Sequence, residues 1–275
     1  MTNKFHCGRF VLDVTKPIVM GIVNLTDDSL SGDGLATDVA AAVRHALRLI
    51  DEGAAILDLG AESSRPGAIT VSAEQEIQRL MPVIHALLDC GVPLSIDTTK
   101  TEVMRAMLDA GVDMINDINA LRADGAMDVL AACKAGVCLM HMQGTPSTMQ
   151  SAPHYADVVK EVARFLDQRV EAATAAGIPH ERIVIDPGFG FGKTLEHNLA
   201  LLRDLAELNR ANLSILVGMS RKAMLGALTG RTASERVFAG VAAHMLAVQR
   251  GARILRTHDV AATADALSVL AAIES

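Results

Sequence analysis

The chain has 275 residues, a formal net charge of −7 and 50% hydrophobic residues, with one tyrosine and no tryptophan. A protein that binds nucleic acid normally carries a basic face and aromatic side chains that stack on bases, so we expect no nucleic-acid partner. The apolar runs are shorter than the roughly 20 residues of a membrane-spanning helix, and the first ten residues lack the apolar stretch of a signal peptide. We therefore expect a cytoplasmic protein with no membrane contact.

Secondary structure is expected to begin with a small β-hairpin at residues 5–14, because apolar and polar residues alternate loosely around Gly8 and Arg9. Eight short apolar runs follow, and each is typical of a buried strand: 18–24, 55–60, 93–97, 113–117, 137–142, 183–186, 214–219 and 253–257. Helical spacing of apolar residues is found at 38–52, 70–89, 100–110, 124–135, 155–176, 196–210, 234–250 and 260–274. Many of these helices end in a glycine, the usual stop before the next strand.

The alternation of strands and helices predicts an α/β protein, a single (β/α)8 TIM barrel with an N-terminal β-hairpin. Length alone would allow two domains, but such barrels often fill this length as one domain. The sequence shows no linker and no low-complexity segment, so we expect residues 1–275 to form a single domain. In this fold the active site lies at the carboxyl ends of the strands.

Polar residues follow the apolar runs at the positions where this rule places a site. Asp97, Asn116 and Asp186 end three predicted strands, and two acids with one amide could read the donor-rich edge of an aminopyrimidine ring. A carboxylate in a barrel mouth is costly unless it is paired. Satisfied strand-end caps are the alternative reading of each residue taken alone, but a less convincing one for the set.

Loops after the first two strands add further candidates. The segment 20–34 is longer than the usual two to six residues of such a connection, so we expect a mobile lid. Asn24, at its start, has an amide oxygen suited to Mg²⁺. Arg65, between a serine and a proline in the second loop, could grip an anion with two N–H groups, although loop arginines are more often simply solvated.

The last strands end in cationic residues. Residues 220–222 (SRK) and 256–258 (RTH) stand where barrels often hold phosphate, and their charges fit a diphosphate; His258 could instead be a general base. The segment 186–193, DPGFGFGK, has glycines that would let the backbone approach a ligand, but it lacks the GxxxxGK[ST] pattern of a phosphate loop. The role of His141, at the end of another predicted strand, stays open.

Eight segments, in order along almost the whole chain, resemble the dihydropteroate synthase family of the folate pathway. They are MGIVN with T and DS (20–29), LDLGAESSRPGA (57–68), SIDT (95–98), INDI (115–118), MHMQGTP (140–146), DPGFGFGK (186–193), GMSRK (218–222) and RTHDV (256–260). The resemblance implies a TIM-barrel transferase, usually a homodimer, that needs Mg²⁺. An enzyme of this family joins 7,8-dihydropterin-6-ylmethyl diphosphate to p-aminobenzoate and releases 7,8-dihydropteroate and diphosphate, and the resemblance implies the same reaction here.

The resemblance also implies roles for individual residues. The pterin-binding set would be Asp97, Asn116, Asp186 and Lys222, with Met140, Phe191 and Gly218 beside the ring. The catalytic set would be Asn24, Arg65, Lys222, Arg256 and His258, with Asn24 as a metal ligand and Arg65, Arg256 and His258 on the diphosphate. The p-aminobenzoate site would be formed by Leu30, Ser64, Arg65, Pro66 and Lys222. The implied mechanism is dissociative, because diphosphate leaves before the neutral arylamine attacks.

The first loop departs from the family pattern at Asp27, where proline is usual, and at Leu30, where phenylalanine is usual. These positions are expected on the p-aminobenzoate side, so one hypothesis is a sulfonamide-tolerant enzyme, and neutral drift in a loop is the other. Two further functions compete. A corrinoid-linked methyltetrahydrofolate methyltransferase would not need the Arg256 and His258 pair. A pterin-binding protein without synthase activity would not need a complete set of anion-binding groups.

Overall fold

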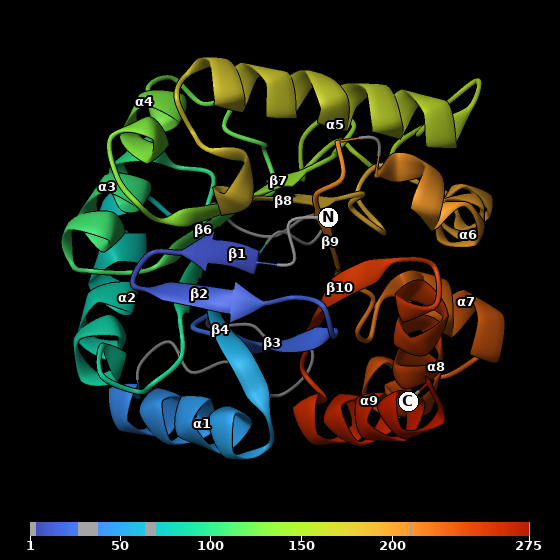
Figure 1. Ribbon diagram of the computed structural model, residues 1–275, viewed down its shortest axis with the longest axis horizontal. Helices are drawn as coiled ribbons and strands as arrows, with labels where there is room; N and C mark the ends of the chain where they lie inside the picture. Colours follow the sequence, from blue (N-terminus) through green and yellow to red (C-terminus); the bar gives the residue numbers. More distant parts are fainter. Residues whose placement is uncertain (1–3, 27–37, 64–69, 210, 275) are drawn as a thin grey trace.

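The computed structural model describes residues 4–26, 38–63, 70–209 and 211–274, and within them eight parallel strands close into a barrel (Figure 1). Around the barrel β10 pairs with β3, and each strand from β3 to β9 pairs with the next, ending at β10. The strands are β3 (Ile18–Asn24), β4 (Ala54–Gly60), β5 (Leu94–Asp97), β6 (Met114–Asp117), β7 (Gly136–Met140), β8 (Ile183–Asp186), β9 (Ser214–Val217) and β10 (Ala252–Thr257). The predicted TIM barrel is confirmed.

Helices form the outer layer in Figure 1 and follow the predicted pattern closely. They are α1 (Val39–Asp51), α2 (Ala73–Leu87), α3 (Thr101–Asp109), α4 (Ala126–Ala131), α5 (Val158–Ala175), α6 (Leu195–Arg203), α7 (Ala223–Thr229), α8 (Val237–Val248) and α9 (Val260–Glu274). Helix α7 was not predicted, because seven residues are too few to show a helical period. The predicted helix 196–210 is wrong at its end, since α6 stops at Arg203 and a 3₁₀ turn covers Leu205–Leu208.

Local sequence explains where these elements begin. The side chain of Asp38 accepts from the N–H of Ala41 and caps α1, whose buried residues Ala42, Ala46 and Leu49 lie at helical spacing. The predicted strands 137–142 and 214–219 are each two residues too long, because β7 ends at Met140 and β9 at Val217. The residues after them turn into the loops that carry polar groups.

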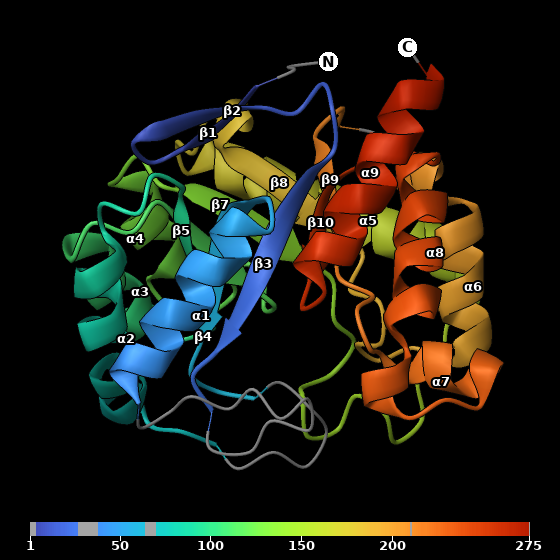
Figure 2. The ribbon, with the colours of Figure 1, turned by 90° about the horizontal axis from the view of Figure 1, so that it is seen from below.

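The predicted hairpin forms from β1 (Lys4–Cys7) and β2 (Phe10–Asp13) and lies across one end of the barrel (Figure 2). Phe5 and Cys7 are buried in the same cluster as Met20, Met114 and other residues of the barrel interior. The hairpin leads directly into β3, so it closes the amino-terminal end of the strands. A binding site must therefore open at the opposite, carboxyl-terminal end, as the fold rule requires.

Gly8 turns the hairpin in the left-handed region, at φ +59°, and a side chain there would collide with Asp113, whose Cα would lie 2.7 Å from an added Cβ. Arg9 next to it forms an ion pair with Asp113 at 2.9 Å. This ion pair attaches the hairpin to the start of β6.

None of the helices among the residues that the structure describes is long and apolar enough to cross a membrane.

Candidate active site

Buried charges converge at the carboxyl ends of the barrel strands. Arg256, near the end of β10, donates from Nε to Asp58 Oδ2 at 2.6 Å and from Nη2 to Asp97 Oδ2 at 2.7 Å. Asp58 comes from β4 and Asp97 from β5, so one guanidinium joins three strands of the closed sheet. Two of the predicted site residues, Asp97 and Arg256, are thus in direct contact.

Asp58 is the site residue that sequence reasoning missed. It is fully buried and accepts from the Ser95 hydroxyl at 2.6 Å and from the Asn116 Nδ2 at 3.1 Å, in addition to Arg256. Because the Asn116 amide nitrogen faces Asp58, its carbonyl oxygen is the atom left to accept from a ligand. The signal was present, since a carboxylate inside an apolar strand is costly unless it is paired.

The two charges across the mouth are Asp186, at the end of β8, and Lys222, just before α7. Burial raises the pKa of Asp186, against the opposing effect of Lys222, and Asp186 Oδ1 accepts from the N–H of Gly188 at 2.7 Å. Burial lowers the pKa of Lys222 to about 8, although Asp186 opposes the shift. Lys222 Nζ donates to the Phe189 carbonyl and lies 4.6 Å from the ring centroid of Phe191, a cation–π contact.

Apolar side chains line the same end of the barrel. Met140 is buried with Ile118, Met142 and Met149, and Phe191 packs against this group. Gly218 lies beside Arg256, with the Arg256 Cβ 3.7 Å from the place of an added Cβ. The structure therefore brings Asp97, Asn116, Met140, Asp186, Phe191, Gly218, Lys222 and Arg256 to one end of the barrel, lined on one side by sulfur and aromatic groups.

Asn24 and His258 form a second part of the mouth, where β3 and β10 end. The Asn24 Nδ2 lies 3.4 Å from His258 Nε2, and His258 Nδ1 lies 3.0 Å from the Ser220 hydroxyl. Arg221, which we expected near an anion, is instead paired with Asp259 at 2.6 Å. Arg221 is thus drawn toward Asp259, whereas Arg256 lies with Asp58 and Asp97 at the strand ends.

Two of the glycines of residues 186–193, Gly188 and Gly192, are required by packing within the protein. A Cβ on Gly188 would collide with the carbonyl of His141, and one on Gly192 would lie 2.7 Å from the carbonyl of Gln143. Both glycines also have positive φ, +68° and +64°. These residues therefore let the segment pack against the backbone that follows β7.

Comparisons with known proteins agree with this geometry. The sequence profile of the family described as "Pterin binding enzyme" matches residues 20–258. The dihydropteroate synthase of Neisseria meningitidis serogroup B is 50% identical over 98% of this chain and 97% of its own length. The chain belongs to the dihydropteroate synthase family of pterin-binding enzymes. The predicted family, a transferase of folate biosynthesis, is confirmed.

Solved structures of dihydropteroate synthases show the same fold. The Xanthomonas albilineans enzyme with 4-aminobenzoic acid is 51% identical with a TM-score of 0.92, covering 100% of this chain and 99% of that one. The Yersinia pestis enzyme, described in a sulfonamide drug complex, is 42% identical with a TM-score of 0.95, covering 98% and 99%. This similarity extends over the whole barrel.

Four residues of the sequence-predicted p-aminobenzoate site, Leu30, Ser64, Arg65 and Pro66, lie outside the residues that the structure describes. Lys222 is the member of that set which can be placed. Glu62, which follows β4, is held by Lys100 Nζ at 2.5 Å, and Lys100 also contacts the buried Glu76 at 2.8 Å. The departures at Asp27 and Leu30 likewise lie outside these residues, so sulfonamide tolerance stays a prediction.

The sequence resemblance implies Mg²⁺, which needs oxygen ligands. Within the described parts of the chain, no group of three or more His, Cys, Asp or Glu side chains could hold a metal ion. Mg²⁺, however, usually keeps several waters and takes one or two protein oxygens together with substrate phosphates. The single amide oxygen of Asn24, beside a mouth that carries Lys222 and Arg256, fits that mode of binding.

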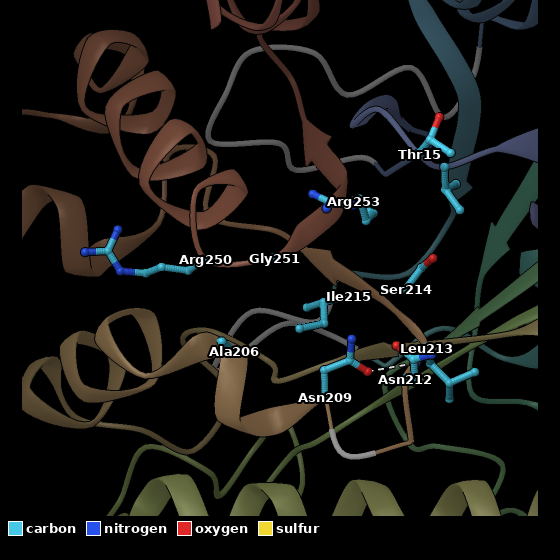
Figure 3. Close-up of a pocket in the computed structure, with 11 residues that line it drawn as sticks. Thr15, Ala206, Asn209, Asn212, Leu213, Ser214, Ile215, Arg250, Gly251 and Arg253 are labelled. Atoms are coloured by element: carbon cyan, nitrogen blue, oxygen red, sulfur yellow. Dashed lines mark hydrogen bonds between the residues drawn. The ribbon is translucent and has the colours of Figure 1, made fainter. Parts of the chain in front are cut away.

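A separate pocket of about 350 Å³ lies away from this mouth, where β9 and β10 begin (Figure 3). Thr15, Ser214, Ile215 and Arg253 are among the residues that line it, and Asn209 Oδ1 there accepts from the Leu213 N–H at 2.7 Å. None of the predicted site residues belongs to its described lining. The amino-terminal face of such barrels serves stability, so we assign the active site to the carboxyl-terminal mouth.

Proposed function

We propose that the protein joins 7,8-dihydropterin-6-ylmethyl diphosphate to p-aminobenzoate and releases 7,8-dihydropteroate and diphosphate. The carrying observation is the convergence of Asp97, Asn116 and Asp186, three acceptors from three strands, around the cations Lys222 and Arg256. The Xanthomonas relative, described with 4-aminobenzoic acid, supports the second substrate. The homology to dihydropteroate synthases favours this reaction over corrinoid methyl transfer and over simple pterin binding.

Pterin recognition follows from the acceptors. The amino and ring N–H groups of the pterin would donate to Asp186, to Asp97 and to the Asn116 carbonyl oxygen, whose orientation Asp58 fixes. Lys222 would donate to a ring acceptor. Met140, Phe191 and Gly218 would lie against the flat faces of the ring. A site built from hydrogen bonds rejects analogues that lack a matching group far more strongly than an apolar pocket rejects a missing methylene.

Diphosphate would lie toward Asn24 and His258, and the sequence assigns Arg65 to the same ligand group. Arg256 uses two of its five N–H donors on Asp58 and Asp97, so three remain for the leaving group. The carbon–oxygen bond to diphosphate breaks first, and the arylamine nitrogen then forms the carbon–nitrogen bond and loses a proton to solvent. Cationic side chains aimed at the oxygen where charge develops favour this step. Mg²⁺ bound beside Asn24 would add Lewis-acid stabilisation of that charge.

We also propose the remaining features of the family for this chain: a single domain over residues 1–275, a cytoplasmic location and a homodimer. The dimer is supported by helices α8 and α9, which are apolar on most sides and pack against each other. Phe238 on α8 is 88% exposed, and Val269 and Ile273 on α9 are also exposed. A second copy of the chain would cover these side chains.

One assay tests the proposed reaction. We expect formation of dihydropteroate and release of diphosphate only when p-aminobenzoate is added to the pterin diphosphate. The same assay with a sulfonamide, comparing its inhibition constant with the KM for p-aminobenzoate, tests the tolerance hypothesis. Methyl transfer from methyltetrahydrofolate to a corrinoid is the control reaction. Pterin binding without diphosphate release, or methyl transfer, would contradict the proposal.

Metal dependence gives a second test. Chelation of divalent ions should stop turnover, while 6-hydroxymethyl-dihydropterin, which lacks the diphosphate, should still bind as measured by calorimetry. Asn24→Ala should raise the Mg²⁺ concentration needed for half-maximal activity. Asn24→Asp should need the same Mg²⁺ concentration as the wild type or a lower one, because a carboxylate is a stronger ligand for Mg²⁺. Full activity in excess chelator would show that the metal assignment is wrong.

A further inference from the structure

The segment from Asp186 to Lys193 is held by side chains that bind its carbonyl groups. The Tyr155 hydroxyl donates to the Gly192 carbonyl at 2.8 Å, and the Gln150 Nε2 donates to the Gly190 carbonyl at 2.6 Å. Lys222 donates to the Phe189 carbonyl. Backbone groups that lack a ladder partner need such partners when they are buried. The segment is therefore fixed by interactions outside regular secondary structure.

Lys193, at the end of this segment, takes the two remaining carbonyls of the glycine-rich part. Its Nζ donates to the Gly188 carbonyl at 2.9 Å and to the Phe191 carbonyl at 3.0 Å, and it lies 2.9 Å from the His141 Nδ1. The side chain is nearly fully buried, at 3% exposure. The Nζ also lies 3.4 Å from the His141 carbonyl, so four acceptors surround it. Burial lowers the pKa of Lys193 well below its usual range, and these contacts hold its amino group in place. In the described parts of the chain, no carboxylate lies within ion-pair distance of this amino group.

His141 lies just after β7 and supplies both its Nδ1 and its backbone carbonyl to Lys193. Its backbone N–H donates to the Asp186 carbonyl at 2.9 Å. Burial, and then the charge of Lys193, lowers the pKa of His141 to about 2, so the imidazole is neutral and Nδ1 can accept. Its ring packs edge-on against Phe165 with centroids 4.9 Å apart. His141 therefore links the end of β7 to the segment that follows β8.

We propose that Lys193 is a positioning residue for the pterin site: its amino group ties the Gly188 and Phe191 carbonyls to His141. The inference rests on the proposed function, because it concerns the same pterin pocket. Lys193 is shielded from the ligand by its burial and acts through its neighbours. The Gly188 N–H fixes one oxygen of Asp186, and the Phe191 ring stands under Lys222.

This arrangement predicts a selective defect. Loosening the segment would move Asp186 and Phe191, both assigned to the pterin, whereas most of the p-aminobenzoate set is assigned from the sequence to other segments of the chain. A purely structural lysine would instead lower stability and leave the two substrates equally affected. The change in pterin Kd, compared with the change in KM for p-aminobenzoate, therefore separates a positioning role from a general contribution to folding.

The test replaces Lys193 by methionine, which has similar length and no donor, with Lys160→Met as the control because Lys160 is exposed on α5. We expect the Kd of 6-hydroxymethyl-dihydropterin, measured by calorimetry, to rise by about tenfold or more, since the Phe191 carbonyl loses the Lys193 donor and the Gly188 carbonyl is left with the Phe191 N–H. With saturating pterin diphosphate, the KM for p-aminobenzoate should stay within about twofold, well below that effect. Lys160→Met should leave both constants unchanged.

A milder variant decides the matter if Lys193→Met does not fold. His141→Leu keeps the amino group of Lys193 and its contacts to the Gly188, Phe191 and residue-141 carbonyls but removes the imidazole, and it should weaken pterin binding by a smaller factor with the same selectivity. The inference is overturned if a folded variant binds pterin like the wild type, or if both substrates weaken equally. A wild-type protein that forms no dihydropteroate would instead overturn the proposed function, so the two failures are distinguishable.

Discussion

Replacement of Asp186 by alanine is expected to lower kcat/KM for the pterin diphosphate on the order of a thousandfold. The N–H groups of the bound pterin that donate to Asp186 would be left without an acceptor, and such a mismatch weakens binding strongly in a site built from hydrogen bonds. Asp186 is buried, its charge interacts with that of Lys222, and its side chain accepts a hydrogen bond from the Gly188 N–H. Alanine would remove both the acceptor for the pterin and the charge that balances Lys222. Steady-state kinetics and pterin calorimetry, at equal concentrations of folded protein, measure the effect.

Asp186→Asn is the matched variant for this experiment. Its amide oxygen can still accept from Gly188, so the local backbone should keep its place. The negative charge is lost, so Lys222 becomes less well compensated and its pKa should fall further below about 8. We expect an intermediate loss of activity. Near-normal pterin affinity in the alanine variant would remove Asp186 from the pterin site.

The second large effect is expected from Asp58→Asn, because this substitution breaks a buried ion pair with Arg256. Breaking such a pair typically costs about 3–5 kcal/mol, since the partner charge stays buried. Arg256 retains Asp97, so we expect a loss in the unfolding free energy of about 3 kcal/mol, at the low end of that range. The kcat/KM for the pterin should fall about a hundredfold, because the one oxygen left at this position cannot accept from Ser95, Asn116 and Arg256 together, which disturbs the orientation of the Asn116 amide.

Asp113→Asn is the matched control for Asp58→Asn. Asp113 is also buried and also paired with an arginine, Arg9, but it lies under the hairpin at the opposite end of the barrel. Denaturant unfolding should show that both variants are destabilised. Only Asp58→Asn should lose activity per folded molecule. Equal catalytic losses in the two variants would mean that Asp58 acts through stability alone.

The pH dependence of pterin affinity, compared between the wild type and Asp58→Asn, gives a sharper readout. Burial raises the pKa of Asp97 to about 7, with Arg256 opposing the shift and Asp58 adding to it. A carboxyl group with a raised pKa takes up a proton at higher pH than usual, so pterin affinity in the wild type should weaken as the pH falls through about 7. Removing the charge of Asp58 lowers the pKa of Asp97, so this loss should move to lower pH in Asp58→Asn.

The sequence by itself determined the barrel and the end of it that carries the site. Near-continuous apolar runs marked the strands, and the polar residues that follow them, Asp97, Asn116, Asp186 and Asn24, lie at the carboxyl-terminal end. These features are local: each depends on the hydrophobic pattern of a few neighbouring residues. For the same reason the short helix α7 was missed, since its seven residues show no period.

Only the tertiary structure decided how the polar residues pair. Asp58 and Arg256 are separated by 198 positions, and the sequence around either residue does not indicate that the other is its partner. Lys193 ends a glycine-rich segment that looks suited to a ligand, yet it is buried against His141, 52 positions away. Charge partners are chosen by the closure of the barrel, which brings distant strand ends within hydrogen-bond distance, whereas hydrophobic periodicity is already fixed within each strand and helix.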